Sequence, residues 1–106
     1  MIVVSRFRVP ECDAGEFRAA LAQAHAALAA CPGYAGGTVG RNVDDPTLWV
    51  LTTTWENVGS YRRALSSYDV KLRAVAVLSR ALDEPSAYEV VTGDTVLNTG
   101  SPRSLG

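Results

Sequence analysis

Two large aromatic side chains with polar tips, Trp55 and Tyr61, stand six residues apart where an apolar run gives way to a helical pattern. Indole N–H and phenol O–H groups donate hydrogen bonds from otherwise apolar bodies, so the pair could line a pocket for a flat aromatic ligand. The same side chains could instead fill the core of a small protein, because aromatic residues bury much apolar area. Their spacing leaves both interpretations open.

An apolar pocket with such donors suits the oxidation of a phenol. A phenolic molecule that loses its proton is electron-rich enough to react directly with O2, so no cofactor is expected. The protein would then exclude water, orient the ring and stabilise the phenolate with hydrogen-bond donors. His25, the single histidine, is a candidate base, because imidazole commonly accepts a proton near neutral pH.

The first half of the chain predicts a strand and a helix. Residues 2–9 are mostly β-branched or aromatic and end at Pro10, which indicates a strand. Asp13 and Glu16 have the spacing of a capping box, and the helix that they begin ends at Pro32-Gly33. One apolar stripe recurs along it at helical spacing: Phe17, Leu21, Ala24, Leu28 and Cys31. His25 lies at the flank of this stripe.

The second half predicts a hairpin, two helical stretches and a strand. Extended runs over 34–43 and 48–56 flank the turn sequence DDPT. A short helix follows and breaks around Ser66-Ser67, and a second helical stretch breaks at Pro85, after which the chain returns to a strand. The apolar positions of that second stretch are Val70, Ala74, Val77, Leu78, Ala81 and Leu82.

The resulting β-α-β-β-α-β order predicts an α+β, ferredoxin-like domain over residues 1–93, with both helices on one face of an antiparallel sheet. Segment 94–106 is rich in Gly, Ser, Thr and Pro and is expected to be a flexible tail. The uncovered sheet face would expose apolar residues and strand edges in a monomer. We therefore expect a homodimer. The apolar residues of that face are Ile2, Val4, Leu48 and Val50.

Composition argues against several classes of protein. With 106 residues, 47% of them hydrophobic, the chain supports one domain with a single core. Its formal charge of -1 and scattered cations provide no basic stripe for nucleic acid. The short N-terminal apolar run suits neither a signal peptide nor a membrane span, so a cytoplasmic protein is expected. One histidine and two cysteines without a CxxC motif argue against a zinc site.

Several short motifs, in this order and spacing, resemble the antibiotic biosynthesis monooxygenase family. They are VVSRFRV, CPGY, DDP, TTWENVGSYRRAL and LDEPSAYEV, and the resemblance covers about residues 2–92. It implies a ferredoxin-like protomer, a dimeric α+β barrel and a pocket between helices and sheet. Characterised members include cofactor-independent oxygenases that act on polyphenolic anthrones and quinols, and haem-degrading relatives.

The resemblance also implies site residues. Quinone-forming members use a Trp at the end of the third strand and a Tyr six residues later, positions that Trp55 and Tyr61 match. Two other family positions differ, since an asparagine is replaced by Leu51 and a histidine by Ala64. Haem degradation is not expected, because the asparagine of haem-degrading relatives corresponds to Ser5 and no histidine follows position 25.

We therefore expect a cofactor-independent monooxygenase-like protein that oxidises a flat phenolic or polyketide-type molecule with O2. The catalytic candidates are Trp55, Tyr61 and His25. The substrate-binding candidates, chosen by strand alternation and helical spacing, are Ser5, Phe7, Leu51, Thr53, Val70, Ala74 and Leu78. Two alternatives stay open: a non-catalytic dimeric ligand-binding or structural module, and a polyketide cyclase or isomerase that needs no oxygen.

Overall fold

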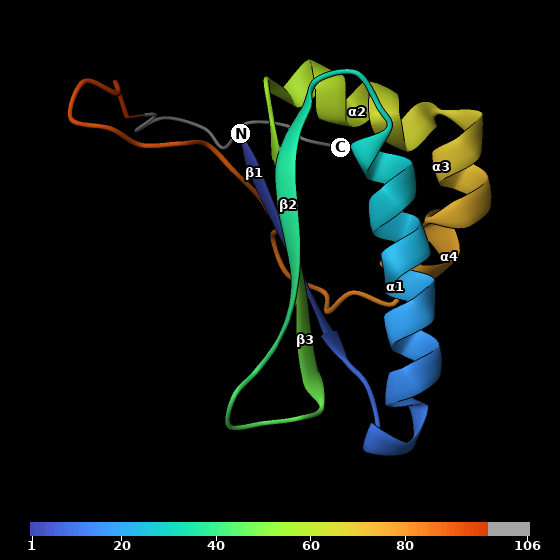
Figure 1. The fold of residues 1–106 in the computed structure, drawn as a ribbon. Coiled ribbons are helices and arrows are strands. Elements are labelled where there is room, and N and C mark those ends of the chain that lie inside the picture. The colour runs from blue at the N-terminus through green and yellow to red at the C-terminus, as the bar shows by residue number, and fades with distance from the viewer. Residues whose placement is uncertain (98–106) are drawn as a thin grey trace.

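A computed structural model, which describes residues 1–97, shows one antiparallel sheet with helices on one face (Figure 1). The strand order is β2-β3-β1-β4, which confirms the ferredoxin-like α+β prediction. In chain order, the elements are β1 (Ile2–Arg8), the 3-10 turn η1 (Glu11–Asp13), α1 (Ala14–Ala29), β2 (Tyr34–Arg41), β3 (Leu48–Trp55), α2 (Val58–Ser66), α3 (Tyr68–Arg73), α4 (Val75–Leu78) and β4 (Ala87–Tyr88).

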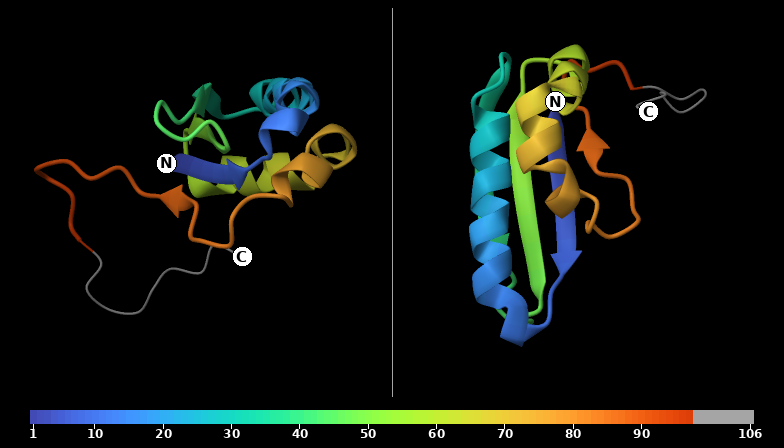
Figure 2. Two further views of the ribbon diagram at one scale, coloured as in Figure 1. Left: turned by 90° about the horizontal axis from the view of Figure 1, so that it is seen from below. Right: turned by 90° about the vertical axis from the view of Figure 1, so that its right-hand side faces the viewer.

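The core lies between the sheet and a layer formed by α1, α3 and α4 (Figure 2). β1 pairs with β3 from Ile2 opposite Thr54 to Arg8 opposite Leu48. Because side chains alternate along each strand, one face of this pair turns to the helices. The buried residues on that face are Val3, Phe7, Trp49, Leu51, Thr53 and Trp55.

The first helix keeps its predicted stripe, and Asp13 is its N-cap residue as predicted, but the predicted capping hydrogen bond is absent. Phe17, Leu21, Ala24 and Leu28 are buried, whereas Cys31 lies beyond the helix end and is half-buried. Asp13 is the last residue of η1, and its N–H donates to the carbonyl of Pro10. Its backbone (φ -98°, ψ 1°) is therefore not extended, and its side chain makes no capping bond.

The predicted hairpin is confirmed, and side chains hold its turn. Asn42 Oδ1 accepts hydrogen bonds from the N–H groups of Asp44 and Asp45. Asp45 in turn accepts from the N–H and the hydroxyl of Thr47, and Arg8 Nη1 lies 2.6 Å from Asp45 Oδ2. The turn is therefore tied to the end of β1.

The second helical region is shorter than predicted. The break at Ser66-Ser67 is confirmed, since Ser67 caps α3 by accepting from the Val70 N–H. A further break at Ala74 separates α3 from α4, which ends at Leu78 instead of continuing to Leu82. Leu82 N–H donates to the carbonyl of Arg6, so the chain runs beside β1 here. The predicted last strand is reduced to Ala87–Tyr88.

The other sheet face carries no helix within residues 1–97 (Figure 1). Its predicted apolar residues, Ile2, Val4, Leu48 and Val50, are half-buried. The predicted tail lies partly outside the described residues. In the part of the chain that the structure describes, no helix is long and apolar enough to cross a membrane.

Candidate functional site

A tight corner between β3 and α2 brings Trp55 and Tyr61 together. Asn57 caps α2, because its side chain accepts from the N–H of Ser60 at 2.8 Å. Gly33, at φ 87°, packs against this corner, where a Cβ would collide with the Ser60 side chain. The rings of Trp55 and Tyr61 lie 5.5 Å apart at 53°.

Trp55 belongs to the core. Its side chain is 3% exposed, and its Nε1–H donates to Thr53 Oγ1 at 2.9 Å. Its ring also packs edge-on against Tyr34, with the centroids 5.5 Å apart. The indole donor is therefore paired inside the protein.

Tyr61 is different, because its side chain lines two adjoining cavities. No group among residues 1–97 forms a hydrogen bond with its hydroxyl. Burial raises the pKa of the Tyr61 hydroxyl, so the group stays protonated at neutral pH and can donate. Within residues 1–97, Tyr61 therefore supplies a donor without a partner from a residue that lines both cavities.

The two cavities have volumes of about 370 and 380 Å³ and share Tyr61, Leu65, Glu84 and Ser86. They exist because α4 ends early and the segment after it follows the edge of β1. The first is further lined by Val4, Ser5, Arg6, Val75, Leu78, Ser79, Ala81 and Leu82. The second is further lined by Met1, Val58, Pro85 and Ala87. Each volume lies in the range of small-molecule sites.

A two-point ion pair stands at the cavity wall. Arg6 Nε and Nη2 donate to the two Glu84 carboxylate oxygens at 2.6 and 2.8 Å. This hydrogen bonding lowers the pKa of the Glu84 carboxyl and raises that of the Arg6 guanidinium. Both groups are therefore charged, and the pair ties the segment after α4 to β1.

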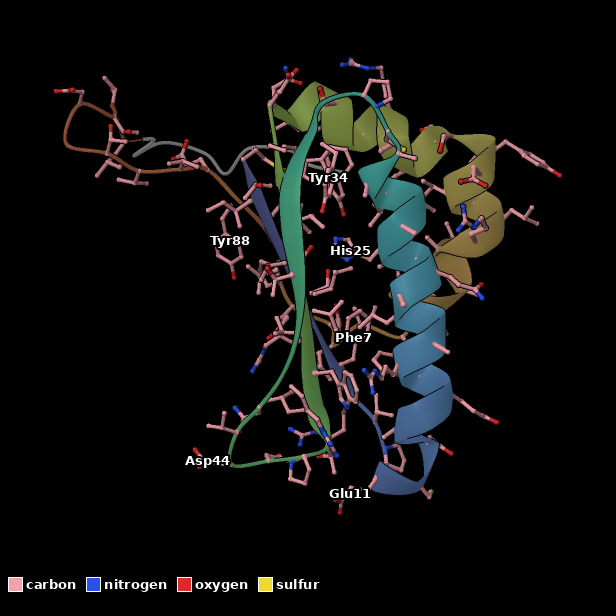
Figure 3. All side chains as sticks on the ribbon, viewed as in Figure 1. Phe7, Glu11, His25, Tyr34, Asp44 and Tyr88 are labelled. Carbon is pink, nitrogen blue, oxygen red and sulfur yellow. The ribbon has the colours of Figure 1, made fainter. Side chains whose placement is uncertain are left out.

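The structure places the predicted site residues in three locations. Ser5, Tyr61 and Leu78 line the first cavity. His25 instead lies on α1, where its Nε2 is 2.7 Å from the Tyr34 hydroxyl (Figure 3). The remaining predicted residues are core side chains that are at most 3% exposed and do not line either of the two described cavities. They are Phe7, Leu51, Thr53, Trp55, Val70 and Ala74. Their role toward a substrate stays a prediction.

Sequence reasoning missed Arg6, Glu84 and the residues just beyond α4 as cavity residues. Arg6 alternates with Ser5 and Phe7 along β1, so alternation assigns it to the other sheet face. β4 pairs only with Ile2 and Val3, however, so Arg6 lies beyond that pairing on β1, where its side chain reaches Glu84. Pro85 was a signal that the helix ends, but nothing local showed that the chain then follows β1.

The chain was compared with known proteins. The sequence profile described as antibiotic biosynthesis monooxygenase matches residues 1–72. The comparison with curated proteins gave no match. Among solved structures, SnoaB, a cofactor-independent oxygenase from Streptomyces nogalater, is 24% identical, with a TM-score of 0.69 over 89% of this chain and 96% of that one.

Two further structures are similar. A point mutant of SnoaB from Streptomyces nogalater is 26% identical, with a TM-score of 0.66 and coverage of 91% and 94%. A candidate antibiotic biosynthesis monooxygenase from Deinococcus radiodurans is 18% identical, with a TM-score of 0.70 and coverage of 92% and 100%. Since the family profile matches most of the chain and the fold agrees, the protein belongs to the antibiotic biosynthesis monooxygenase family.

Proposed function

We propose that the protein is a cofactor-independent monooxygenase of the quinone-forming type that oxidises a flat phenolic or polyketide-type molecule with O2. Family membership supports a monooxygenase-type function. The similarity to SnoaB supports chemistry without a cofactor. The observation that carries the proposal is that Tyr61 lines both cavities and that its hydroxyl has no hydrogen-bond partner among residues 1–97.

The cavities offer apolar surface and a hydrogen-bond donor for such a reaction. Leu65, Leu78 and Leu82 provide apolar surface for a flat ring, and Tyr61 donates to the oxygen of its phenolate. The electron-rich ring then reacts with O2. For an anthrone, the ring CH2 becomes C=O, with one oxygen atom from O2 retained in the product and the other leaving as water.

Trp55 acts on this site through Tyr61. It contacts the Tyr61 ring from the core side, and its N–H is held by Thr53. We therefore assign Trp55 as a positioning residue. His25 does not line the described cavities, and its imidazole is instead in hydrogen-bond contact with the Tyr34 hydroxyl.

A homodimer is part of the proposal. The outer sheet face has apolar residues that no helix of residues 1–97 covers. The final described segment also exposes apolar side chains, at Val90, Val91, Val96 and Leu97. A second copy of the chain packed on the outer sheet face would cover its apolar residues.

Oxygen uptake with a panel of anthrones and dihydroquinones tests the activity. We expect turnover above buffer, with one atom of ¹⁸O₂ in the product, and we expect Tyr61→Phe to lose most of it because the phenolate then lacks its donor. Tyr68→Phe is the matched control, since Tyr68 is 80% exposed on α3. If the wild-type protein does not exceed buffer with any substrate of the panel, the proposed activity is wrong.

The non-catalytic binding module is the second candidate function. The burial of Trp55, Leu51 and Ala64 favours it, because family site positions are here filled by core packing. Such a module would bind the same aromatic molecules without consuming O2. Binding measured by Tyr and Trp fluorescence, together with oxygen uptake, separates the two functions.

A further inference from the structure

Four aromatic rings form a continuous series from the cavity wall to α1. Tyr61 contacts Trp55, Trp55 contacts Tyr34, and Tyr34 contacts His25. The successive centroid distances are 5.5, 5.5 and 6.0 Å. Figure 3 shows His25 and Tyr34 at the far end, between β2 and α1. Phenol and indole are the side chains most easily oxidised by one electron, and here they touch in sequence.

The three rings that carry a phenol or indole differ in whether a base lies within reach of their O–H or N–H proton. The Tyr34 hydroxyl lies 2.7 Å from His25 Nε2, so a base is in hydrogen-bond contact. Trp55 Nε1–H donates to the Thr53 hydroxyl, which is not a base. The Tyr61 hydroxyl has no partner among the described residues. An oxidised phenol is stable only after it loses its proton, so Tyr34 is the favoured end point.

The backbone at Gly37 leaves room for this pair. A Cβ at Gly37 would lie 2.7 Å from both His25 Nε2 and the Tyr34 hydroxyl oxygen. Any larger residue on this part of β2 would separate the phenol from the imidazole. The contact therefore depends on three positions, on α1 and at both the start and the middle of β2.

We propose that Tyr61, Trp55 and Tyr34 form a relay that carries a one-electron oxidising equivalent from the cavity to Tyr34, with His25 as proton acceptor. The proposal rests on the proposed function for its oxidant, which is the alkoxyl or hydroxyl radical formed when the O–O bond of a substrate hydroperoxide, the adduct of the phenolate and O2, breaks homolytically in the cavity. The relay would remove such oxidants from the cavity when turnover is not completed.

Each transfer of an electron or a proton has a defined donor and acceptor. Trp55 gives one electron, through the Tyr61 ring, to the oxidant in the cavity, which is reduced. Tyr34 then gives one electron to the Trp55 radical cation and restores the neutral indole. At the same time the Tyr34 O–H bond breaks and its proton forms an N–H bond at His25 Nε2. The products are a Tyr34 phenoxyl radical and a His25 imidazolium.

A photo-oxidant attached at the cavity replaces substrate and O2 in the test. A ruthenium polypyridyl group is coupled to Ser79→Cys, because Ser79 is exposed and lines the first cavity. Cys12→Ser and Cys31→Ser make the coupling specific. Tyr68→Phe and Tyr88→Phe remove phenols that are 80% and 50% exposed and open to direct oxidation. Radicals formed after a laser flash with an electron acceptor are identified by electron paramagnetic resonance.

We expect a tyrosyl signal that Tyr34→Phe abolishes. Trp55→Phe should abolish it as well, whereas Trp49→Phe should leave it unchanged. Trp49 is the matched control, because it is an equally buried indole that packs on Phe17 instead of on the relay. His25→Gln, which keeps a hydrogen-bonding group without a base, should also remove the signal.

A tyrosyl signal that survives Tyr34→Phe would overturn the relay, and so would equal losses in Trp55→Phe and Trp49→Phe. Replacing tyrosine by 3-fluorotyrosine in the unsubstituted relay shifts the hyperfine pattern of a tyrosyl radical and distinguishes it from a tryptophanyl radical, while the Tyr34→Phe variant identifies the position. The relay can be detected in a protein that oxidises no phenol. Its failure is therefore distinguishable from failure of the proposed oxygenase activity.

Discussion

A hydrogen-bond donor can serve a substrate only if the protein leaves it unpaired, and the two donors at the β3–α2 corner differ in this respect. The Trp55 N–H is bonded to Thr53, whereas the Tyr61 hydroxyl faces the cavities without a partner among the described residues. Tyr61 therefore carries the substrate contact in our proposal, and the Tyr61→Phe experiment tests that contact directly.

The carboxyl group of Asp45 makes the free energy of unfolding depend on pH. Hydrogen bonds from the Thr47 hydroxyl and N–H, and then from Arg8, lower the pKa of its carboxyl from 3.8 to about 2. Because the folded pKa is depressed, the contribution to stability is present above pH 3.8 and is lost as the pH falls toward 2. We expect Asp45→Asn to lower the free energy of unfolding at pH 5 and to match the wild type near pH 2.

Urea titrations across this range measure the effect. Asp44→Asn is the neighbouring control, because the Asp44 backbone N–H, not its carboxylate, bonds to Asn42. A stability difference between Asp45→Asn and wild type that does not change with pH would contradict the assignment.

At the scale of elements, the site depends on where helices begin and end. α2 begins immediately after β3 and carries Tyr61 on its first turn, and α4 ends at Leu78 so that the following segment can border the cavities. The Arg6–Glu84 pair and the bond from Leu82 N–H to the Arg6 carbonyl hold that segment on β1. The site is therefore formed where α2 begins and where the chain continues beyond the end of α4.

The Asn57 cap is expected to stabilise the start of α2. Asn57 accepts hydrogen bonds from the N–H and the hydroxyl of Ser60 at 2.8 and 3.1 Å. We expect Asn57→Ala to lower the free energy of unfolding by about 1 kcal/mol, and Asn57→Asp to restore most of it. Thermal and urea unfolding measure this change. Glu56→Ala, at the preceding exposed position, is the control; equal losses in Glu56→Ala and Asn57→Ala would contradict the role of the cap.

At the scale of the whole molecule, the sheet is covered on one side only. The helices lie on the inner face of the sheet (Figure 2). On the outer face, Ile2, Val4 and Val50 remain partly exposed. One-sided coverage of an apolar sheet favours association of two copies. The ferredoxin-like protomer is shown by the structure, and the dimer is proposed from this surface.

Size-exclusion chromatography with light scattering tests the dimer. We expect a dimer for the wild type and a monomer for Val50→Arg, because a charge on the outer face would be buried without a partner. Leu72→Arg, on the helical side where Leu72 is 68% exposed, should remain dimeric. A wild-type monomer at micromolar concentration would refute the proposal.

The element order, the hairpin, the buried stripe of the first helix and the Trp55–Tyr61 corner could all be predicted from the sequence. These features depend on local periodicity and turn chemistry, which neighbouring residues specify. Three features could not be predicted in this way. They are the bond from Trp55 to Thr53, the contact of His25 with Tyr34, and the position of the cavities beside β1, between α2 and residues 81–86. Those contacts join side chains from separate elements, so they depend on how the helices and strands pack and not on any local pattern.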